Sequence, residues 1–151
     1  MSDLARRSAV PLFERLCARE GESGDASSFD AAGLQLSIAN ELGRLLNTRC
    51  GLTVAEFLTS HATVLNYGVP DFSAMSSRSF TDLSLLSNVV EHAIALFEPR
   101  LSHTQVQAVA SGSGPGFANM HITAAVWLGL TLRRVDFDVP VDLSNGTSGA
   151  P

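Results

Sequence analysis

Hydrophobic and polar residues recur with two different periods along this chain. Between residues 30 and 97, apolar residues return every three or four positions, as on one face of an α-helix. After residue 103 they return every second position, as on one face of a β-strand. The pattern therefore predicts an α+β fold, in which two main helices pack on a small antiparallel C-terminal sheet.

Two long helices are predicted between these limits. The first runs from Asp30, a suitable N-cap, to about Arg49, and Gly51 is its expected stop. The second begins near Ser79, where Asp82 three residues later resembles a capping box. Residues 52–60 fit neither period. The apolar faces comprise Leu34, Ile38, Leu42, Leu45 and Leu46 in the first helix, and Leu86, Val89, Val90, Ala93, Ile94 and Phe97 in the second.

Three strands are predicted after the second helix. They cover residues 104–110, 120–128 and 133–141, and the Ser/Gly run at 111–116 reads as a connector. The last strand alternates most cleanly, because Val135, Phe137, Val139 and Val141 share one face while Asp136 and Asp138 share the other. This pattern is typical of a half-buried antiparallel strand with an acidic outer face.

The two ends of the chain differ from its middle. Residues 4–19 predict a short helix with Leu12, Phe13 and Leu16 on its apolar side, and residues 20–28 have the composition of a linker. We therefore expect an N-terminal helical arm and linker over 1–28, a domain over 29–143, and a flexible tail over 144–151.

The segment Phe97-Glu98-Pro99-Arg100-Leu101 closes the second helix in an unusual way. A carboxylate in the last turn meets the negative end of the helix dipole, and Pro99 prevents the helix from continuing. Glu98 and Arg100 are expected to point the same way and to present an exposed pair of opposite charges on a rigid corner. Two interpretations stay open from the residues alone: an internal salt bridge, or a contact with a partner.

Composition narrows the function classes. The chain has 151 residues, 45% apolar and 17% charged, as in an ordinary single globular domain. Its formal net charge of -5 argues against nucleic-acid binding. The ten basic residues are all arginine, which excludes a Schiff-base lysine or a P-loop lysine. Cys17 and Cys50 show no CxxC spacing, and neither a signal peptide nor a long apolar run is present, so we expect a cytoplasmic protein without membrane insertion.

Candidate chemistry is sparse. The four histidines, His61, His92, His103 and His121, show no metal-ligand spacing, and the glycine run at 112–116 matches no nucleotide fingerprint. A glycosidase would need two facing carboxylates, for which Glu41, Glu56, Glu91 and Glu98 are the candidates. Glu41 and Glu91 read as solvated helix faces, and Arg100 beside Glu98 favours its ionised form. We expect no catalytic, cofactor-binding or metal-binding residues.

Four short motifs occur in a recognisable order. They are Pro11-Leu12-Phe13-Glu14-Arg15-Leu16, Ser37-Ile38 leading to Leu45-Leu46-Asn47-Thr48-Arg49, Asn66-Tyr67-Gly68-Val69-Pro70-Asp71, and Phe97-Glu98-Pro99-Arg100-Leu101. With these motifs, residues 11–143 resemble the baseplate wedge family of contractile injection machines, and most closely its type VI secretion branch, TssE. The family includes a small phage baseplate protein labelled lysozyme-like. The Ser/Gly run after Ala110 and the uncharged C-terminal tail depart from the family pattern.

The resemblance implies assembly without catalysis or cofactor. It implies partners among the other wedge subunits and the contractile sheath, at a cytoplasmic baseplate docked on the inner membrane. Glu98, Pro99 and Arg100 would grip the core bundle of the wedge. We expect the arm to dock through Leu12, Phe13 and Leu16, and the strand of Val135, Phe137 and Val139 to offer an edge for β-augmentation by sheath strands. The alternative is a peptidoglycan-cleaving, lysozyme-like enzyme.

Overall fold

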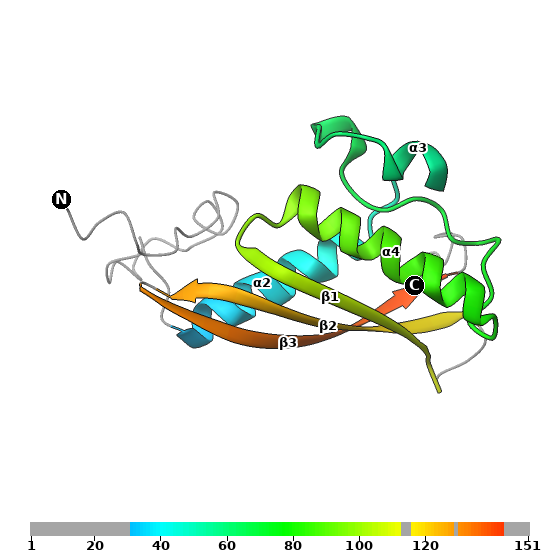
Figure 1. Ribbon diagram of the computed structural model, residues 1–151. Helices are drawn as coiled ribbons and strands as arrows, with labels where there is room; N and C mark the ends of the chain where they lie inside the picture. Colours follow the sequence, from blue (N-terminus) through cyan, green and yellow to red (C-terminus); the bar gives the residue numbers. More distant parts are fainter. Residues whose placement is uncertain (1–30, 113–115, 129, 144–151) are drawn as a thin grey trace, which may run out of the picture.

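The computed structural model of the protein describes residues 31–112, 116–128 and 130–143. Two helices, α2 (Ala31–Leu46) and α4 (Phe80–Phe97), cover one face of a three-stranded sheet, while the short helices α3 (Val54–Leu58) and η2 (Val64–Asn66) lie in the connection between them (Figure 1). The predicted α+β fold, with two main helices on a small antiparallel sheet, is confirmed. The arm, the linker, the N-cap Asp30 and the C-terminal tail lie outside the described residues.

Helix α2 buries the predicted apolar face, since Leu34, Ile38, Leu42, Leu45 and Leu46 are all at most 2% exposed. The helix ends earlier than predicted, at Leu46, and Gly51 is not its stop. The side chains of Asn47 and Thr48 donate hydrogen bonds to the carbonyls of Gly43 and Arg44 at 2.9 and 2.7 Å. These bonds satisfy carbonyls that would otherwise lack partners at the helix end.

Apolar spacing predicted neither of the two short helices, and α3 is the longer of them. Thr53 is its N-cap and Glu56 its third residue, and the two form a capping box in which each side chain accepts a hydrogen bond from the other residue's backbone N–H. The Thr-x-x-Glu signature was therefore present in a segment with no clear hydrophobic period. Phe57 anchors the helix and packs edge-on against His92 of α4, with ring centroids 5.5 Å apart.

Helix α4 begins at the predicted N-cap, because the Ser79 hydroxyl accepts a hydrogen bond from the Asp82 N–H. The reciprocal half of the box is absent: the Asp82 carboxylate accepts from the N–H of Ser76 at 2.9 Å. Its buried stripe, Leu86, Val89, Val90, Ala93 and Ile94, agrees with the prediction, and Phe97 is partly buried.

The sheet is a meander in the order β1-β2-β3, made of β1 (Leu101–Ala110), β2 (Phe117–Leu128) and β3 (Thr131–Asp142). All three strands are longer than predicted, and β1 starts directly after the Glu98 corner. Both pairings are antiparallel, and β2 and β3 pair without interruption from Phe117–Asp142 to Leu128–Thr131. Between Ser102 and Gln105 the register of β1 shifts, next to His103 with its positive φ of 51°.

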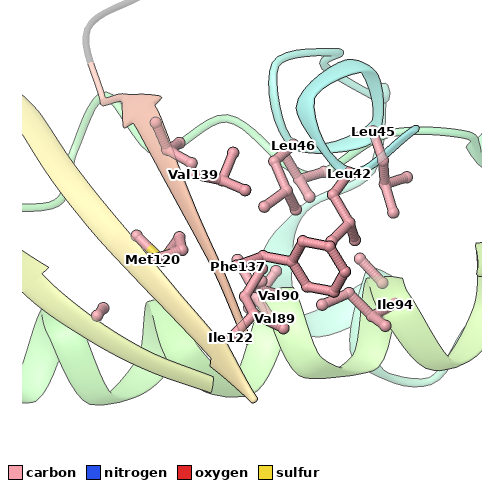
Figure 2. Close-up of a cluster of buried hydrophobic side chains, with 14 of the residues drawn as sticks. Leu42, Leu45, Leu46, Val89, Val90, Ile94, Met120, Ile122, Phe137 and Val139 are labelled. Atoms are coloured by element: carbon pink, nitrogen blue, oxygen red, sulfur yellow. The ribbon is translucent and has the colours of Figure 1, made fainter. Parts of the chain in front are cut away.

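The core lies between the two helices and the inner face of the sheet. Figure 2 shows Leu42, Leu45 and Leu46 of α2 meeting α4 and the sheet. Helix α4 packs mainly on β1, and α2 packs on β3. The other labelled side chains in this cluster are Val89, Val90 and Ile94 of α4, Met120 and Ile122 of β2, and Phe137 and Val139 of β3.

The predicted loop at 66–71 is pinned beneath the end of α2. Val69 donates to the Thr48 carbonyl and accepts from the Cys50 N–H, both at 2.9 Å. Gly68 adopts a φ of 114°, and a Cβ there would lie 2.5 Å from the Thr48 carbonyl oxygen. Glycine therefore allows the two backbone segments to approach.

Arg49 connects this loop region to the far end of the sheet. Its guanidinium donates to the carbonyls of Leu46 and Asp142 and lies 5.3 Å from the centroid of the Phe72 ring. The end of α2 is thereby fixed beside the end of β3.

Candidate partner-binding surface

At the corner between α4 and β1, one backbone hydrogen bond completes the helix and another lies where the strand begins. The N–H of Glu98 donates to the Ile94 carbonyl at 2.9 Å, which completes α4. The N–H of Leu101 then donates to the Glu98 carbonyl at 3.2 Å, where β1 begins. Pro99 is exposed at the tip of this turn.

The charged pair at the corner is largely buried. The Arg100 Nε and Nη2 atoms donate to the two carboxylate oxygens of Glu98 at 2.7 and 2.6 Å, a two-pronged contact. The Glu98 side chain is 5% exposed and that of Arg100 is 17% exposed. The expectation of an exposed pair is therefore wrong, and the internal salt bridge kept as the other interpretation is the one observed.

A third residue joins the pair to the first half of α2. Arg100 Nη1 donates to the hydroxyl of Ser37 at 3.0 Å, and Ser37 is itself buried. The bridge therefore links the end of α4, the start of β1 and α2. Ser37 was noted in the sequence only as the neighbour of Ile38 in a motif. Nothing in the helical spacing indicated that its hydroxyl would meet Arg100, which lies 63 residues further along the chain.

The loop motif at 66–71 also reaches this corner. The ring of Tyr67 packs edge-on against Phe97, with centroids 5.4 Å apart. Burial, together with the nearby charge of Glu41, raises the pKa of the Tyr67 phenol. The second, third and fourth sequence motifs therefore meet in space at the end of α4.

The residues proposed on the last strand face the core. Val135, Phe137 and Val139 are 6–8% exposed, so a partner cannot reach their side chains in this structure. Among the described residues, β2 is nevertheless the only strand that pairs with theirs, so the second edge of β3 has no strand partner there, although the carbonyl of its last residue, Asp142, accepts from Arg49. On the outer face, Asp136 accepts a hydrogen bond from Thr123 at 2.7 Å, and Asp138 lies 2.9 Å from His121 Nδ1.

The other candidate carboxylates serve local structure or solvent. Glu41 pairs with Arg44 on the surface of α2, and Glu91 is exposed on α4. The hydrogen bonds that Glu56 accepts from the Thr53 side chain and backbone lower its pKa. A glycosidase acid needs the opposite shift.

Within residues 31–112, 116–128 and 130–143, no group of three or more His, Cys, Asp or Glu side chains could hold a metal ion. No helix in the same part of the chain is long and apolar enough to cross a membrane.

One surface was not singled out from the sequence. Trp127 and Leu132 are paired across β2 and β3, and with Leu130 they form an exposed apolar group at the β2–β3 connection. Their exposed fractions are 57%, 41% and 70%. The alternation of residues in β2 placed Trp127 on the same outer face as His121 and Thr123, and this was the sequence signal that could have identified the exposed apolar group.

Comparisons with known proteins agree with this architecture. Residues 32–129 match the family model of the baseplate wedge protein gp25. One chain of the baseplate complex from the type VI secretion system is 21% identical, with a TM-score of 0.51 over 72% of this chain and 94% of that one. A protein of Geobacter sulfurreducens, provisionally described as a tail lysozyme, is 20% identical, with a TM-score of 0.51 over 80% of this chain and 100% of that one.

A search of curated proteins found no match. At this level of identity the two solved structures support the fold, whereas the family model extends over well more than half of the sequence. The chain belongs to the gp25 family of baseplate wedge proteins.

Proposed function

We propose that the protein is a structural subunit of a type VI secretion baseplate, which joins wedge subunits and starts assembly of the contractile sheath. Family membership and the fold shared with a chain of a type VI baseplate support this role. The observation that carries the sheath role is β3, a 12-residue strand with one open edge among the described residues. In this role the protein acts at a cytoplasmic baseplate docked on the inner membrane.

The corner is proposed as the wedge contact. Pro99 is exposed and Arg100 keeps part of its side chain at the surface, whereas Glu98 is enclosed. We propose that a wedge partner packs on Pro99 and the exposed side of Arg100, and that Glu98 and Ser37 hold the guanidinium in the binding orientation. The arm adds a second contact to the wedge through Leu12, Phe13 and Leu16.

The open edge of β3 is proposed as the sheath contact. Val135, Phe137 and Val139 anchor the strand in the core, so that the backbone N–H and C=O groups that do not pair with β2 are held in line for an incoming strand, apart from the Asp142 carbonyl, which accepts from Arg49. Asp136 and Asp138 stand on the outer face and disfavour pairing with unrelated edges.

Pro140 indicates which residues present their N–H groups at this edge. Proline donates no hydrogen bond and is tolerated within a strand where its nitrogen faces away from the ladder. Because backbone groups alternate along a strand, the N–H of Asp138 points the same way as the nitrogen of Pro140. Asp138→Pro should therefore fold normally and remove a donor from the open edge.

The test compares Asp138→Pro with Asp138→Thr, which loses the same carboxylate and keeps the N–H. Each full-length variant is co-expressed with the wedge and sheath subunits. We expect both variants to co-purify with the wedge, and only Asp138→Pro to stop sheath polymerisation. Normal sheath assembly by a folded Asp138→Pro protein would exclude augmentation at this edge.

The second candidate function is peptidoglycan cleavage, which the fold likeness to a tail lysozyme brings forward. Glu56 is held in a helix cap and Glu98 in a salt bridge, and neither arrangement suits a general acid. We expect purified protein to release no soluble fragments from labelled peptidoglycan. Turnover that disappears in Glu56→Gln or Glu98→Gln would establish the enzyme instead.

A further inference from the structure

The apolar group at the β2–β3 connection, consisting of Trp127, Leu130 and Leu132, is called the hairpin end below. Trp127 and Leu132 are direct cross-strand partners on the outer face, opposite the face that α2 and α4 cover. All three side chains are more than 40% exposed in the described part of the chain. A cluster of large apolar side chains exposed at one end of a sheet face indicates an interaction site.

The chain segment outside the structure joins the domain at this same end. Ser37 contacts Arg100, and the next residue, Leu101, pairs with Val126 immediately before Trp127. The other end of α2 is tied through Arg49 to Asp142, at the far end of β3. The first residue of α2 therefore lies toward the hairpin end, and so does the point at which residues 1–30 attach.

We propose that the N-terminal arm folds back and covers the hairpin end with its own apolar side in the free subunit. Leu12, Phe13 and Leu16 fall at spacings of one and four residues, and so share one face of a helix. Residues 20–30 can span up to roughly 36 Å, while a sheet and its packed layer are about 10 Å apart. The linker is therefore long enough to pass around the end of the sheet to its outer face.

Charge favours the same path. Residues 20–30 contain Glu20, Glu22, Asp25 and Asp30 and no basic residue. Beside the hairpin end, Arg133 and Arg134 are both exposed. Arg134 already lies 3.7 Å from the Asp136 carboxylate, so Arg133 is the arginine that attracts an acidic linker to the surface that the arm would cover. Tethering also raises the local concentration of the arm to the millimolar range.

The stability of the arm as a helix also favours this contact. A single short helix is marginal in water and gains stability only by burying its apolar side. The hairpin end supplies such a surface on the same molecule. In the assembled baseplate, the proposed wedge contact of the arm would replace this internal contact, but the internal contact itself does not depend on that function.

Trp127 is the single tryptophan of the chain, so tryptophan fluorescence reports directly on whether the arm covers the hairpin end. The experiment compares the full-length wild-type protein with a triple variant that combines Leu12→Ser, Phe13→Ser and Leu16→Ser. For each protein, the emission maximum of Trp127 and its quenching by acrylamide are measured. We expect the triple variant to emit at longer wavelength and its quenching constant to rise by roughly twofold, since a tethered arm covers the ring most of the time.

Two control variants separate shielding of Trp127 by the arm from unspecific effects of the substitutions. Ala18→Ser changes the opposite side of the arm, and Val64→Ser with Leu65→Ser changes exposed residues of η2, which are 95% and 90% exposed. Both should quench like wild type, and circular dichroism should show the same fold for all four proteins. Protection of residues 11–19 from hydrogen exchange should be present in wild type and lost in Trp127→Ser with Leu130→Ser.

Equal quenching of wild type and the triple variant would overturn the proposal. Shielding that disappears on dilution would also overturn it, because a second copy rather than the arm would then cover the hairpin end.

Discussion

At the scale of single residues, the Glu98–Arg100 bridge combines an unfavourable position with a favourable partner. The carboxylate sits at the negative end of α4, yet it accepts two charge-assisted hydrogen bonds in a site nearly closed to water. A bridge of this kind contributes little net stability relative to apolar residues, but removal of one partner leaves an uncompensated charge. The bridge therefore fixes the geometry of the corner more than it stabilises the fold.

Glu98→Ala should destabilise the isolated protein by roughly 3 kcal/mol, because Arg100 is left partly buried without its carboxylate. Glu41→Ala is the matched control, since Glu41 pairs with Arg44 on an exposed helix face and should cost about 0.5 kcal/mol or less. Urea unfolding of both variants measures the difference. Similar midpoints for the two would mean that the corner bridge behaves as a surface pair.

Gly68 is the second residue whose identity is dictated by local geometry. Gly68→Ala should destabilise the protein by roughly 1–3 kcal/mol from backbone conformation alone, and the approach to Thr48 adds to this cost. Gly43→Ala is the control, because a Cβ at Gly43 meets nothing within 4 Å and alanine is the better helix former. Thermal melting should move down for the first variant and slightly up for the second. A neutral Gly68→Ala would contradict the close approach.

At the scale of elements, the hydrophobic period predicted the long helices and the strands and missed the two short helices, α3 and η2. Helices α2 and α4 bury continuous stripes, so their cores were readable residue by residue. Helix α3 is five residues long and buries Phe57 alone, so its apolar residues show no helical period. Its only sequence signal is the capping box formed by Thr53 and Glu56. The end of α2 was misplaced because side-chain hydrogen bonds from Asn47 and Thr48, and not a glycine, close it.

The cap makes α3 sensitive to acid. The folded-state pKa of Glu56 lies below its ordinary value of 4.5, so its contribution is complete above that pH and is lost as pH falls through the lowered pKa. Hydrogen exchange in α3 should therefore accelerate with acid relative to α4, after correction for intrinsic rates. Glu56→Gln keeps a capping partner without a titrating group and should abolish that extra acceleration. An unchanged pH dependence in Glu56→Gln would assign the effect elsewhere.

At the scale of the whole molecule, the sequence predicted the layers of the fold but not the contacts between distant segments. Alternation placed Val135, Phe137 and Val139 inward and Asp136 and Asp138 outward, as observed. It could not show that Ser37 meets Arg100 or that Arg49 meets Asp142, because local spacing carries no information on which elements become neighbours. The position of the corner at the end of α4 was predicted correctly, but the exposure of its charged pair was not, because the burial of that pair depends on α2.

Two of the contacts that hold α2 in place, besides its packing in the core, join residues that lie unusually far apart along the chain. Helix α4 and the three strands follow one another and contact their immediate successors, whereas the links from α2 to Arg100 and Asp142 join residues 63 and 93 positions apart. Closing such long loops costs entropy before any contact is gained. Helix α4 and the meander should therefore organise first during folding, with α2 docking after the transition state. Arg49→Ala should then accelerate unfolding and leave the folding rate nearly unchanged in stopped-flow experiments. The protein would in this way keep an early-forming half, which carries the open strand, and a late-docking helix, which closes the corner.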